Sequence, residues 1–453
     1  MHARPLSWPE PDAGGGRTAR GRGLDQGSLR AGSLDLAKRT REVDLGQKDW
    51  RPGKRVAVVG GGPGGISAAI ALNQQGYDVR VFERQQEPKA MGGAVLLSVP
   101  VLAVLRSYGI DIENFGSFTV TEFRNNRGKV RVRLPFNEKV EKAMGIRGWH
   151  YGVLRSSAFA KMLERLPADL IVPNHAFSSY EEREDGIVLK FHNGEEVTAD
   201  LLIGADGVRS RVSEQTFGDL GLFHIGLRLW LAWCDDVPGI DRTVGALHHS
   251  RRVQASYFPM LHDGKPGFEW WVVEPVEEGA PSPADVERHL RGLLEEFADP
   301  MPRFPDHTNF ATQIFRWDIY NRPSLTKWTK GRVACVGDAV HPVSPYAAYG
   351  MGMAIEDGYF LARALGGRDL ADRQGLSEAF ARYESERVKY VNHQVEFARK
   401  LGKQFHHAPA PVAFIRDLVF DNTQVLQKTV SKGSLDDAEK MSIQLRELHV
   451  ANA

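Results

Sequence analysis

Three glycines near residue 60 have the spacing of a turn that binds a phosphate. Gly60, Gly62 and Gly65 form a GxGxxG pattern within the stretch KRVAVVGGGPGGISAAIALNQQGYDVRVFER. In such a turn the first glycine allows the tight bend, the second lets the backbone approach a pyrophosphate, and the third lets strand and helix pack closely. The helix that follows would direct its free amides and its positive dipole end at the phosphates.

An acid lies where a bound dinucleotide would need one. Glu83 ends the second apolar run, about two dozen residues after Gly60. A carboxylate at this place accepts hydrogen bonds from an adenosine ribose and would repel a ribose 2'-phosphate. Glycine-rich turns are common in loops, but this one follows an apolar strand, opens a helix and is followed by the acid. The sequence therefore predicts a strand, turn, helix and strand that bind a dinucleotide.

Two further acids follow apolar runs. Asp206 lies in DLLIGADGVRSRV, and Asp338 lies in GDAVHPVSPYAAYGMGMAIED after the run 332–336. Taken alone, a strand that ends in GADG is an ordinary turn. After Asp338 the chain crosses an uncharged loop of small and aromatic residues, and helical spacing resumes near Gly350. A charged side chain in that loop would bring water into any site that it borders.

The composition limits what such a site could bind. The 453 residues suffice for two lobes, and 58 Lys and Arg nearly balance 57 Asp and Glu. A nucleic acid or an anionic membrane is therefore not expected as a partner. The two cysteines, Cys234 and Cys335, lie far apart in apolar runs, which argues against a disulfide framework and indicates a reducing compartment. No clustered His, Cys and Asp spacing suggests a metal.

Nothing in the chain resembles a membrane or secretion segment. No apolar run approaches the roughly 20 residues of a membrane span, and the N-terminus lacks the apolar core of a secretory signal. The sequence predicts a cytoplasmic protein without a membrane span. Residues 1–53 are rich in Arg and Gly, as in GGGRTARGRG, and predict a disordered tail, with an RNA-binding arm as the alternative.

The glycine turn, the GADG motif and the GD motif, in this order, resemble the group A FAD-dependent monooxygenases. These are single-component aromatic hydroxylases with the para-hydroxybenzoate hydroxylase fold. The resemblance runs from about residue 54 to Arg387 and includes Val153-Leu154-Arg155, which is similar to the family's FAD-contacting arginine. Tyr383-Glu384-Ser385-Glu386-Arg387 resembles the start of the family's C-terminal helix, although a solvated helix face is the alternative for this segment.

The resemblance implies an α/β fold with a Rossmann-type FAD-binding lobe, a mixed β-sheet substrate lobe and C-terminal helices. The FAD-binding lobe would comprise residues 54–110, 150–216 and 317–370. The substrate lobe would comprise 111–149 and 217–316, where apolar and aromatic runs alternate with turns. Residues 371–453 would be helical. No second GxGxxG follows the first, so NADH or NADPH would dock transiently on the FAD-binding lobe.

The resemblance also assigns roles to individual residues. Asp338 would hydrogen-bond the ribityl chain of FAD, Pro345 would lie near the reacting edge of the ring, and the helix at Gly350 would direct amides at its pyrimidine end. His341 would support the loop, and no catalytic side chain is assigned. The predicted FAD contacts are Gly60, Gly62, Pro63, Gly64, Gly65, Glu83, Arg84, Gly93, Ala94, Arg155, Asp206, Gly337, Asp338, Pro345, Gly350, Met351 and Gly352.

The sequence departs from the family pattern in both later motifs. Gly352 stands where an asparagine is common, so a side-chain contact with the flavin is lost there. Ser213 stands where the GADG motif usually ends in an arginine, and Arg209 or Arg211 would have to replace it. This second departure bears more on docking of the nicotinamide than on FAD.

Within GFEWWVVEP a strand would send neighbouring side chains to opposite faces. Phe268 and Trp270 would share one face, and Glu269 and Trp271 the other. Because acids are rarely buried unpaired, the face of Glu269 is expected to point outward. Phe268 and Trp270, together with Pro345, are therefore predicted to line the substrate site.

The function implied by the resemblance is that of an FAD-dependent monooxygenase. It would use NADH or NADPH and O2 to hydroxylate or epoxidise an aromatic or polycyclic small molecule through a flavin C4a-hydroperoxide. The same scaffold supports FAD-dependent dehydrogenases, reductases and halogenases, although the WxWxIP segment of halogenases is absent from the sequence. A non-enzymatic FAD-binding or redox-sensing role is a further alternative.

Overall fold

The computed structural model describes residues 50–90, 92–134, 138–147, 150–344, 349–430, 439–442 and 445. Pro345 and most of the predicted tail lie outside this part of the chain. The end of that tail, residues 50–53, is ordered, which corrects the predicted boundary. Trp50 is buried beneath the guanidinium of Arg80, 4.6 Å from its ring centroid, and the amide of Leu370 donates to the carbonyl of Gly53.

A six-stranded sheet carries the first glycine motif. Its order is β17 (Thr329–Lys330), β18 (Val333–Cys335), β11 (Leu201–Gly204), β1 (Arg55–Val59), β2 (Asp78–Phe82) and β7 (Ile171–Val172). All pairs are parallel except β17 with β18. The central strands β11 and β18 are wholly buried and apolar, as parallel strands covered on both faces are.

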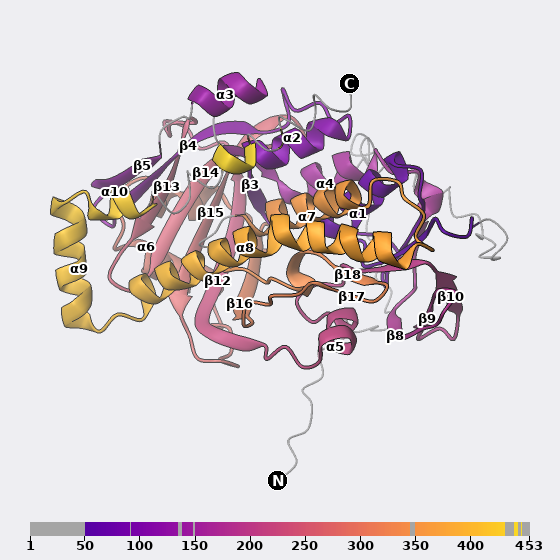
Figure 1. The fold of residues 1–453 in the computed structure, drawn as a ribbon. Coiled ribbons are helices and arrows are strands. Elements are labelled where there is room, and N and C mark those ends of the chain that lie inside the picture. The colour runs from indigo at the N-terminus through magenta and orange to yellow at the C-terminus, as the bar shows by residue number, and fades with distance from the viewer. Residues whose placement is uncertain are drawn as a thin grey trace, which may run out of the picture. The chain divides into compact units, whose positions relative to one another are not determined.

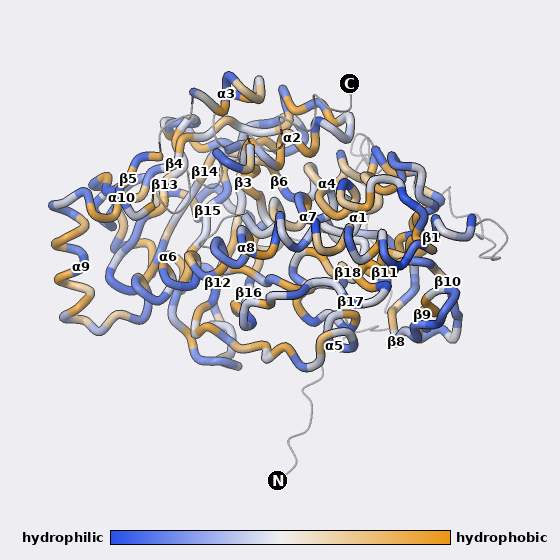
Figure 2. The backbone as a smooth tube through the Cα atoms, viewed as in Figure 1, coloured by the Kyte–Doolittle hydropathy of each residue, from blue (hydrophilic) through white to orange (hydrophobic). Residues whose placement is uncertain are grey.

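Two helices pack together beside this sheet. They are α1 (Pro63–Gln74) and α7 (Gly350–Leu365), and Figure 2 shows apolar residues along both where they lie close to each other. Gly358 makes this contact so close that a Cβ there would lie 2.4 Å from the amide nitrogen of Ala68. The close packing places the start of α7 near the start of α1.

A nine-stranded mixed sheet forms the second large element. Its main path runs β16 (Ile314–Asn321), β12 (Phe223–Asp235), β15 (Lys265–Pro275), β14 (Gln254–His262), β13 (Val244–His249), β4 (Ser117–Asn125), β6 (His150–Leu154) and β3 (Ala94–Ser98), and β5 (Val130–Leu134) pairs with β4. Strands β3, β6 and most of β16 come from segments that were predicted to belong to the FAD-binding lobe. The sheet has two buried faces with separate apolar clusters.

The remaining elements surround these two sheets (Figure 1). A small antiparallel sheet contains β8 (Phe177–Glu182), β9 (Ile187–Phe191) and β10 (Glu196–Ala199). The other helices are α2 (Val99–Ser107), α3 (Glu138–Met144), α4 (Arg155–Leu163), α5 (Arg211–Phe217), α6 (Val286–Leu294), α8 (Arg373–His406), α9 (Ala410–Asn422) and α10 (Val425–Val430), with short 3-10 turns at Ala168–Leu170, Met301–His307 and Gly337–Ala339. In the described residues, no helix combines the length and apolar character that crossing a bilayer requires.

The long helix α8 runs past both sheets in Figure 1. Leu376, Ala379 and Phe380 near its start belong to the same apolar cluster as the six-stranded sheet. Ala398 and Leu401 near its end belong to the cluster on one face of the nine-stranded sheet. Helix α8 therefore contributes to the packing of both sheets.

Candidate active site

A cavity of about 560 Å³ lies where the two large sheets meet. One side consists of the segments that follow β1, β11 and β18, and the other side is a face of the nine-stranded sheet. Ligands bind at this end of parallel strands in open α/β sheets. Of the residues predicted to contact FAD, the cavity is lined by Gly62, Pro63, Gly64, Ala94, Arg155, Gly337, Asp338, Gly350, Met351 and Gly352.

The glycine turn has the geometry that its sequence predicts. Gly60 has φ of +104°, and a Cβ there would lie 2.4 Å from the carbonyl oxygen of Ala205. A Cβ at Gly65 would lie 2.0 Å from the carbonyl oxygen of Gly60, whereas the space around Gly62 is open. Gly60 and Gly65 thus allow close backbone contacts within the turn that a side chain would prevent. Gly62 exposes its backbone to the cavity without a side chain.

The N-termini of α1 and α7 both open into this cavity. Gly62 and Tyr349 are the N-cap residues, and neither helix receives a side-chain cap or has an acid in its first turn. The first amides of a helix have no partner within the helix, so both ends offer hydrogen-bond donors and positive dipole ends to a ligand. Gly352 fits closely in the first turn of α7, since a Cβ there would lie 2.8 Å from side-chain carbons of Tyr349 and Val101.

Glu83 is held rigidly at the end of β2. One carboxylate oxygen accepts a hydrogen bond from the amide of Gly61 at 2.8 Å, and the other accepts from the amide of Gln85 at 2.9 Å. The side chain is 9% exposed. Each oxygen retains a second lone pair for a ribose hydroxyl. Arg84 beside it is exposed and does not line the cavity.

Asp338 lies in the short 3-10 turn Gly337–Ala339 and exposes its side chain at the wall of the cavity. Desolvation by the surrounding protein raises the pKa of this carboxyl. The neighbouring His341, Arg155 and Arg322 oppose this increase of the pKa. An acid with these neighbours is available to accept hydrogen bonds from a polar ligand.

Arg322 links the two later motifs, a role that we did not predict from the sequence. Its Nη1 donates to the carbonyl of Ala339 at 2.8 Å, and its Nη2 donates to the carbonyl of Val208. Ser213 donates to the same Ala339 carbonyl at 2.6 Å. Burial lowers the pKa of Arg322, and the charge of Asp338 is the largest factor that offsets this effect. A buried arginine outside the GADG motif therefore joins this motif to the GD turn.

A fully buried charged cluster supports the cavity from behind. Arg387 contacts Glu356 at 2.8 Å and Asp357 at 2.9 Å. Asp357 also accepts from the amide of Gly337 at 2.9 Å and contacts Nε2 of His341 at 2.5 Å. His341 is therefore a structural support of the loop, as predicted. Tyr349, which lines the cavity, hydrogen-bonds Glu356.

Tyr383, Glu384 and Arg387 are buried, whereas Ser385 is exposed, so the alternative of a solvated helix face is wrong for these three residues. Tyr383 donates to the carbonyl of Cys335 at 3.2 Å. Glu384 accepts from the amides of Trp328 and Thr329 at 2.8 and 3.0 Å. Together with Arg387, these residues fasten α8 to the strand that precedes Asp338.

Comparison with known proteins agrees with this geometry. A family model described as FAD binding domain matches residues 54–398. The chain belongs to this family. It is 29% identical to 6-hydroxynicotinate 3-monooxygenase of Pseudomonas fluorescens over 74% of the chain and 88% of the relative. It is also 29% identical to 3-amino-4-hydroxybenzoate 2-monooxygenase of Streptomyces cremeus over 82% and 92%.

The fold of this FAD-binding family is also found among solved structures. The complex of HpxO from Klebsiella pneumoniae with FAD and uric acid superposes with a TM-score of 0.73 at 22% identity, covering 86% of this chain and 98% of HpxO. The resemblance to the group A family and the predicted α/β fold are confirmed. The chain is an FAD-dependent monooxygenase by family, and FAD is its cofactor.

The residues around the cavity fit FAD. The open backbone at Gly62 and the uncapped start of α1 suit a pyrophosphate. Glu83 and Asp338 would supply acceptors for ribose and ribityl hydroxyls, and the uncapped start of α7 would supply donors for the ring. The individual contacts with FAD remain predictions. No group of three His, Cys, Asp or Glu suited to a metal occurs among the described residues.

Two other predicted contacts, Gly93 and Asp206, do not line the cavity. Gly93 is buried behind the wall. Asp206 turns its carboxylate toward α5, where it accepts from Ser210 Oγ and from the amide of Arg211 at 2.8 Å. Its neighbours Ala205 and Gly207 line the cavity in its place. Pro345 lies outside the described residues.

The predicted face of β15 is wrong. Glu269 and Trp271 line the cavity, whereas Phe268 and Trp270 lie on the opposite face. There Trp270 stacks on Phe304 and donates from Nε1 to Thr308 Oγ1 at 2.8 Å. The prediction assumed that an acid would face water, but the Glu269 side chain is only 2% exposed and points toward the cavity.

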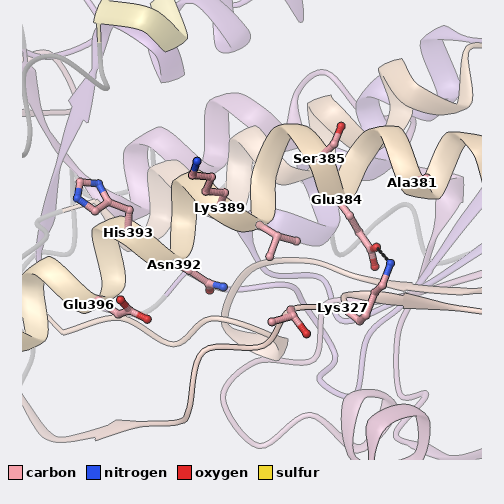
Figure 3. Close-up of a pocket in the computed structure, with 10 residues that line it drawn as sticks. Lys327, Ala381, Glu384, Ser385, Lys389, Asn392, His393 and Glu396 are labelled. Atoms are coloured by element: carbon pink, nitrogen blue, oxygen red, sulfur yellow. Dashed lines mark hydrogen bonds and ion pairs between the residues drawn. The ribbon is translucent and has the colours of Figure 1, made fainter.

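A second depression, of about 650 Å³, lies along α8 (Figure 3). Lys327 and Glu384 form an ion pair of 2.8 Å at one end of it, and Lys389, Asn392 and Glu396 line the rest. None of its ten lining residues is a Phe, Tyr or Trp, and it lacks a glycine turn. We therefore assign FAD to the cavity between the sheets.

Proposed function

We propose that the protein uses NADH or NADPH and O2 to hydroxylate or epoxidise an aromatic small molecule. The observation that carries this proposal is the contrast between the two walls of one cavity. The wall that follows the parallel strands offers helix amides and acids, which suit a cofactor. The wall formed by the nine-stranded sheet is mostly apolar and suits a planar ring, with Leu229, Leu231, Phe258, Trp271 and Ile319.

The proposal assigns a separate task to each part of the chain. The segments around the six-stranded sheet bind FAD, and the nine-stranded sheet covers the substrate. FAD, when bound, supplies the reaction of O2 with electrons taken from the nicotinamide. NADH or NADPH docks transiently beside it, and a cytoplasmic location would provide both.

The residues of the chain orient the reactants and exclude water. The start of α7 offers Gly350, Met351 and Gly352 at the cavity, where uncapped amides stabilise negative charge. Pro342 and Val343 bring uncharged surface to the loop after Asp338. This apolar surrounding strengthens the electrostatic effect of the amides and limits side reactions with water.

The names of similar proteins support an aromatic substrate. One acts on 6-hydroxynicotinate and another on 3-amino-4-hydroxybenzoate. Zeaxanthin epoxidase of Nicotiana plumbaginifolia is 29% identical over 69% of this chain and 48% of that relative. For this reason the proposal includes epoxidation as well as hydroxylation.

Isotope labelling tests the proposal directly. Purified protein with FAD is incubated with NADH or NADPH, 18O2 and a panel of phenols, hydroxypyridines, quinolones and larger polycyclic aromatics. A product that gains one 18O atom, together with faster flavin reduction when its precursor is present, is the expected result. Oxidation of the nicotinamide without labelled product from any compound would favour the alternative of a reductase.

A further inference from the structure

Glu269 is a buried acid whose place in the wall of the cavity has no structural explanation so far. Its side chain is 2% exposed and belongs to β15, between β12 and β14. Its Oε2 is buried without a hydrogen-bond partner among the described residues. Because nearly all buried polar groups in proteins have a partner, a ligand in the cavity is the natural partner for this oxygen.

The described residues around Glu269 offer no hydrogen-bond partner to its Oε2. Across the sheet it pairs with Trp233 on β12 and Phe258 on β14, which are not charged. Gly93 lies against this carboxyl, and a Cβ there would come 2.6 Å from Oε2. The absence of a side chain at Gly93 therefore keeps space for the carboxyl.

One cation acts on this carboxyl. Burial raises the pKa of Glu269 well above its usual range, and the charge of Arg155 at the start of α4 opposes the increase. Arg155 also interacts with Asp338, so its charge is shared between two acids. A protonated carboxyl both donates and accepts a hydrogen bond.

The other polar groups on this wall are already engaged. Asp318 is bound by Arg228 at 2.7 Å and by Arg316 at 2.8 Å, and the hydroxyl of Tyr320 interacts with Glu278. Trp271 and its neighbours are apolar. Glu269 is thus the polar side chain whose carboxylate oxygen lacks a hydrogen-bond partner, among the described residues that the nine-stranded sheet contributes to the cavity.

We propose that Glu269 determines substrate specificity by pairing with a neutral planar ring that carries a hydrogen-bond donor beside an acceptor. A lactam or a hydroxylated nitrogen heterocycle has this chemistry, and it forms two hydrogen bonds with one protonated carboxyl. An arenecarboxylate is disfavoured, because it lacks the donor and meets any ionised Glu269 with like charge. This inference rests on the proposed function, since it names the class of substrate for the same site.

Equilibrium binding to the oxidised holoenzyme tests the inference without turnover. The probes are 2-quinolone, 2-naphthoate and naphthalene, which have similar shapes and differ in hydrogen bonding and charge. Binding is followed by the fluorescence of Trp271 and Trp317, which line the cavity. The wild type should bind 2-quinolone at least about tenfold more tightly than 2-naphthoate.

Two substitutions separate hydrogen bonding from packing. Glu269→Gln keeps a donor and an acceptor and should bind 2-quinolone within about threefold of the wild type, whereas Glu269→Leu should lose about tenfold or more. Naphthalene affinity should change little in either variant. The matched control is Glu277→Gln, in an exposed residue just beyond β15.

The pH dependence of binding is a second measurement of the same group. In the wild type, 2-quinolone affinity should fall as pH rises through the raised pKa of Glu269, because the donor proton is lost. The Gln variant should show no such fall. FAD content and melting temperature of each variant are measured alongside.

Several results would overturn the inference. Equal losses for 2-quinolone and naphthalene in Glu269→Leu would show a packing role, and unchanged binding would show that no ligand meets Glu269. Loss of FAD from both variants would place the cofactor, not the substrate, against this carboxyl. Selective binding of 2-quinolone without any labelled product from lactams would contradict the proposed monooxygenase reaction while leaving the binding role of Glu269 intact.

Discussion

Arg387 on α8 and Asp357 on α7 form an ion pair in which both side chains are fully buried, with 2.9 Å between Nε and Oδ1. The same aspartate binds the amide of Gly337, directly before the acid that faces the cavity. The C-terminal helix thus fixes the position of a turn that lies at the cofactor site. None of the charges in this pair touches the cavity itself.

Replacement of Arg387 should destabilise the whole protein. In Arg387→Met the acids Glu356 and Asp357 lose their cation while they stay buried, which costs about 3 to 5 kcal/mol. Thermal unfolding and the temperature at which FAD is released should both shift downward. Arg382→Met is the control, because Arg382 lies on the same helix but is half exposed and pairs with Glu386 at 3.4 Å. Similar shifts in the two variants would contradict this role of Arg387.

Removal of the Asp338 carboxylate should abolish FAD retention without unfolding the protein. We expect the wild type to purify yellow, whereas Asp338→Ala should be folded and largely colourless. The measurement is the ratio of flavin to protein absorbance after gel filtration, with circular dichroism to check the fold. Asp338→Asn should retain part of the FAD. Stoichiometric FAD in the Ala variant would remove Asp338 from the site.

Loss of Glu83 should weaken FAD binding while the turn remains. A hydrogen bond to a charged group contributes about 1.5 to 3 kcal/mol, so Glu83→Ala should raise the FAD dissociation constant by at least about tenfold. Titration of the apoprotein with FAD measures this change. Because Glu83 also holds the amides of Gly61 and Gln85, Glu83→Gln serves as the comparison. An unchanged dissociation constant in Glu83→Ala would be inconsistent with a ribose contact.

The two adjacent tryptophans of β15 should give opposite phenotypes. Trp271 lines the cavity, so Trp271→Ala should release more hydrogen peroxide per nicotinamide oxidised, since water can enter the site. Trp270 is fully buried on the other face, and Trp270→Ala should mainly lower stability, by about 3 to 5 kcal/mol. Peroxide yield and melting temperature, measured for both variants, distinguish the cavity role from the packing role. A larger peroxide yield from the Trp270 variant would contradict the observed strand register.

Acid should destabilise the protein through buried histidines. Burial lowers the pKa of His248 and of His406 to about 3, whereas an unfolded histidine titrates near 6.5. Protonation therefore favours the unfolded chain below about pH 6.5. Each of these histidines lowers the free energy of unfolding by about 1.4 kcal/mol per pH unit. Melting temperature should fall between pH 7 and 5, and His406→Asn should reduce this slope. The control is His307→Asn, at an exposed position.

The features that were predictable from the sequence are those set by local backbone geometry. The glycine turn at Gly60 and the acid at Asp338 follow from short stretches in which each residue type has a local task. Their convergence at one cavity also follows, because the ends of parallel strands lie along one edge of a sheet. The fold and the family were predicted through the resemblance that these motifs carry.

The features that were missed depend on contacts between distant segments. Arg322 comes from the end of β16 and joins carbonyls of two other segments, and no local pattern marks it. Glu269 was expected to face water because it is an acid. This expectation failed because its side chain faces a ligand cavity instead. The assignment of β3 and β6 to the nine-stranded sheet was also missed, because the sequence of a short apolar strand does not reveal with which sheet it pairs.

The order of the six-stranded sheet has a consequence for the nascent chain. Val56 on β1 pairs with Leu201 on β11, and Leu202 on β11 pairs with Val333 on β18. During translation, β1 and α1 leave the ribosome well before their neighbours, and the delay until β18 is on the order of tens of seconds. Until β11 has been synthesised, the apolar strand β1 lacks its partner on one side, and β11 in turn waits for β18. The earliest part of the cofactor site to be synthesised is thus completed late, and until then it needs protection from aggregation.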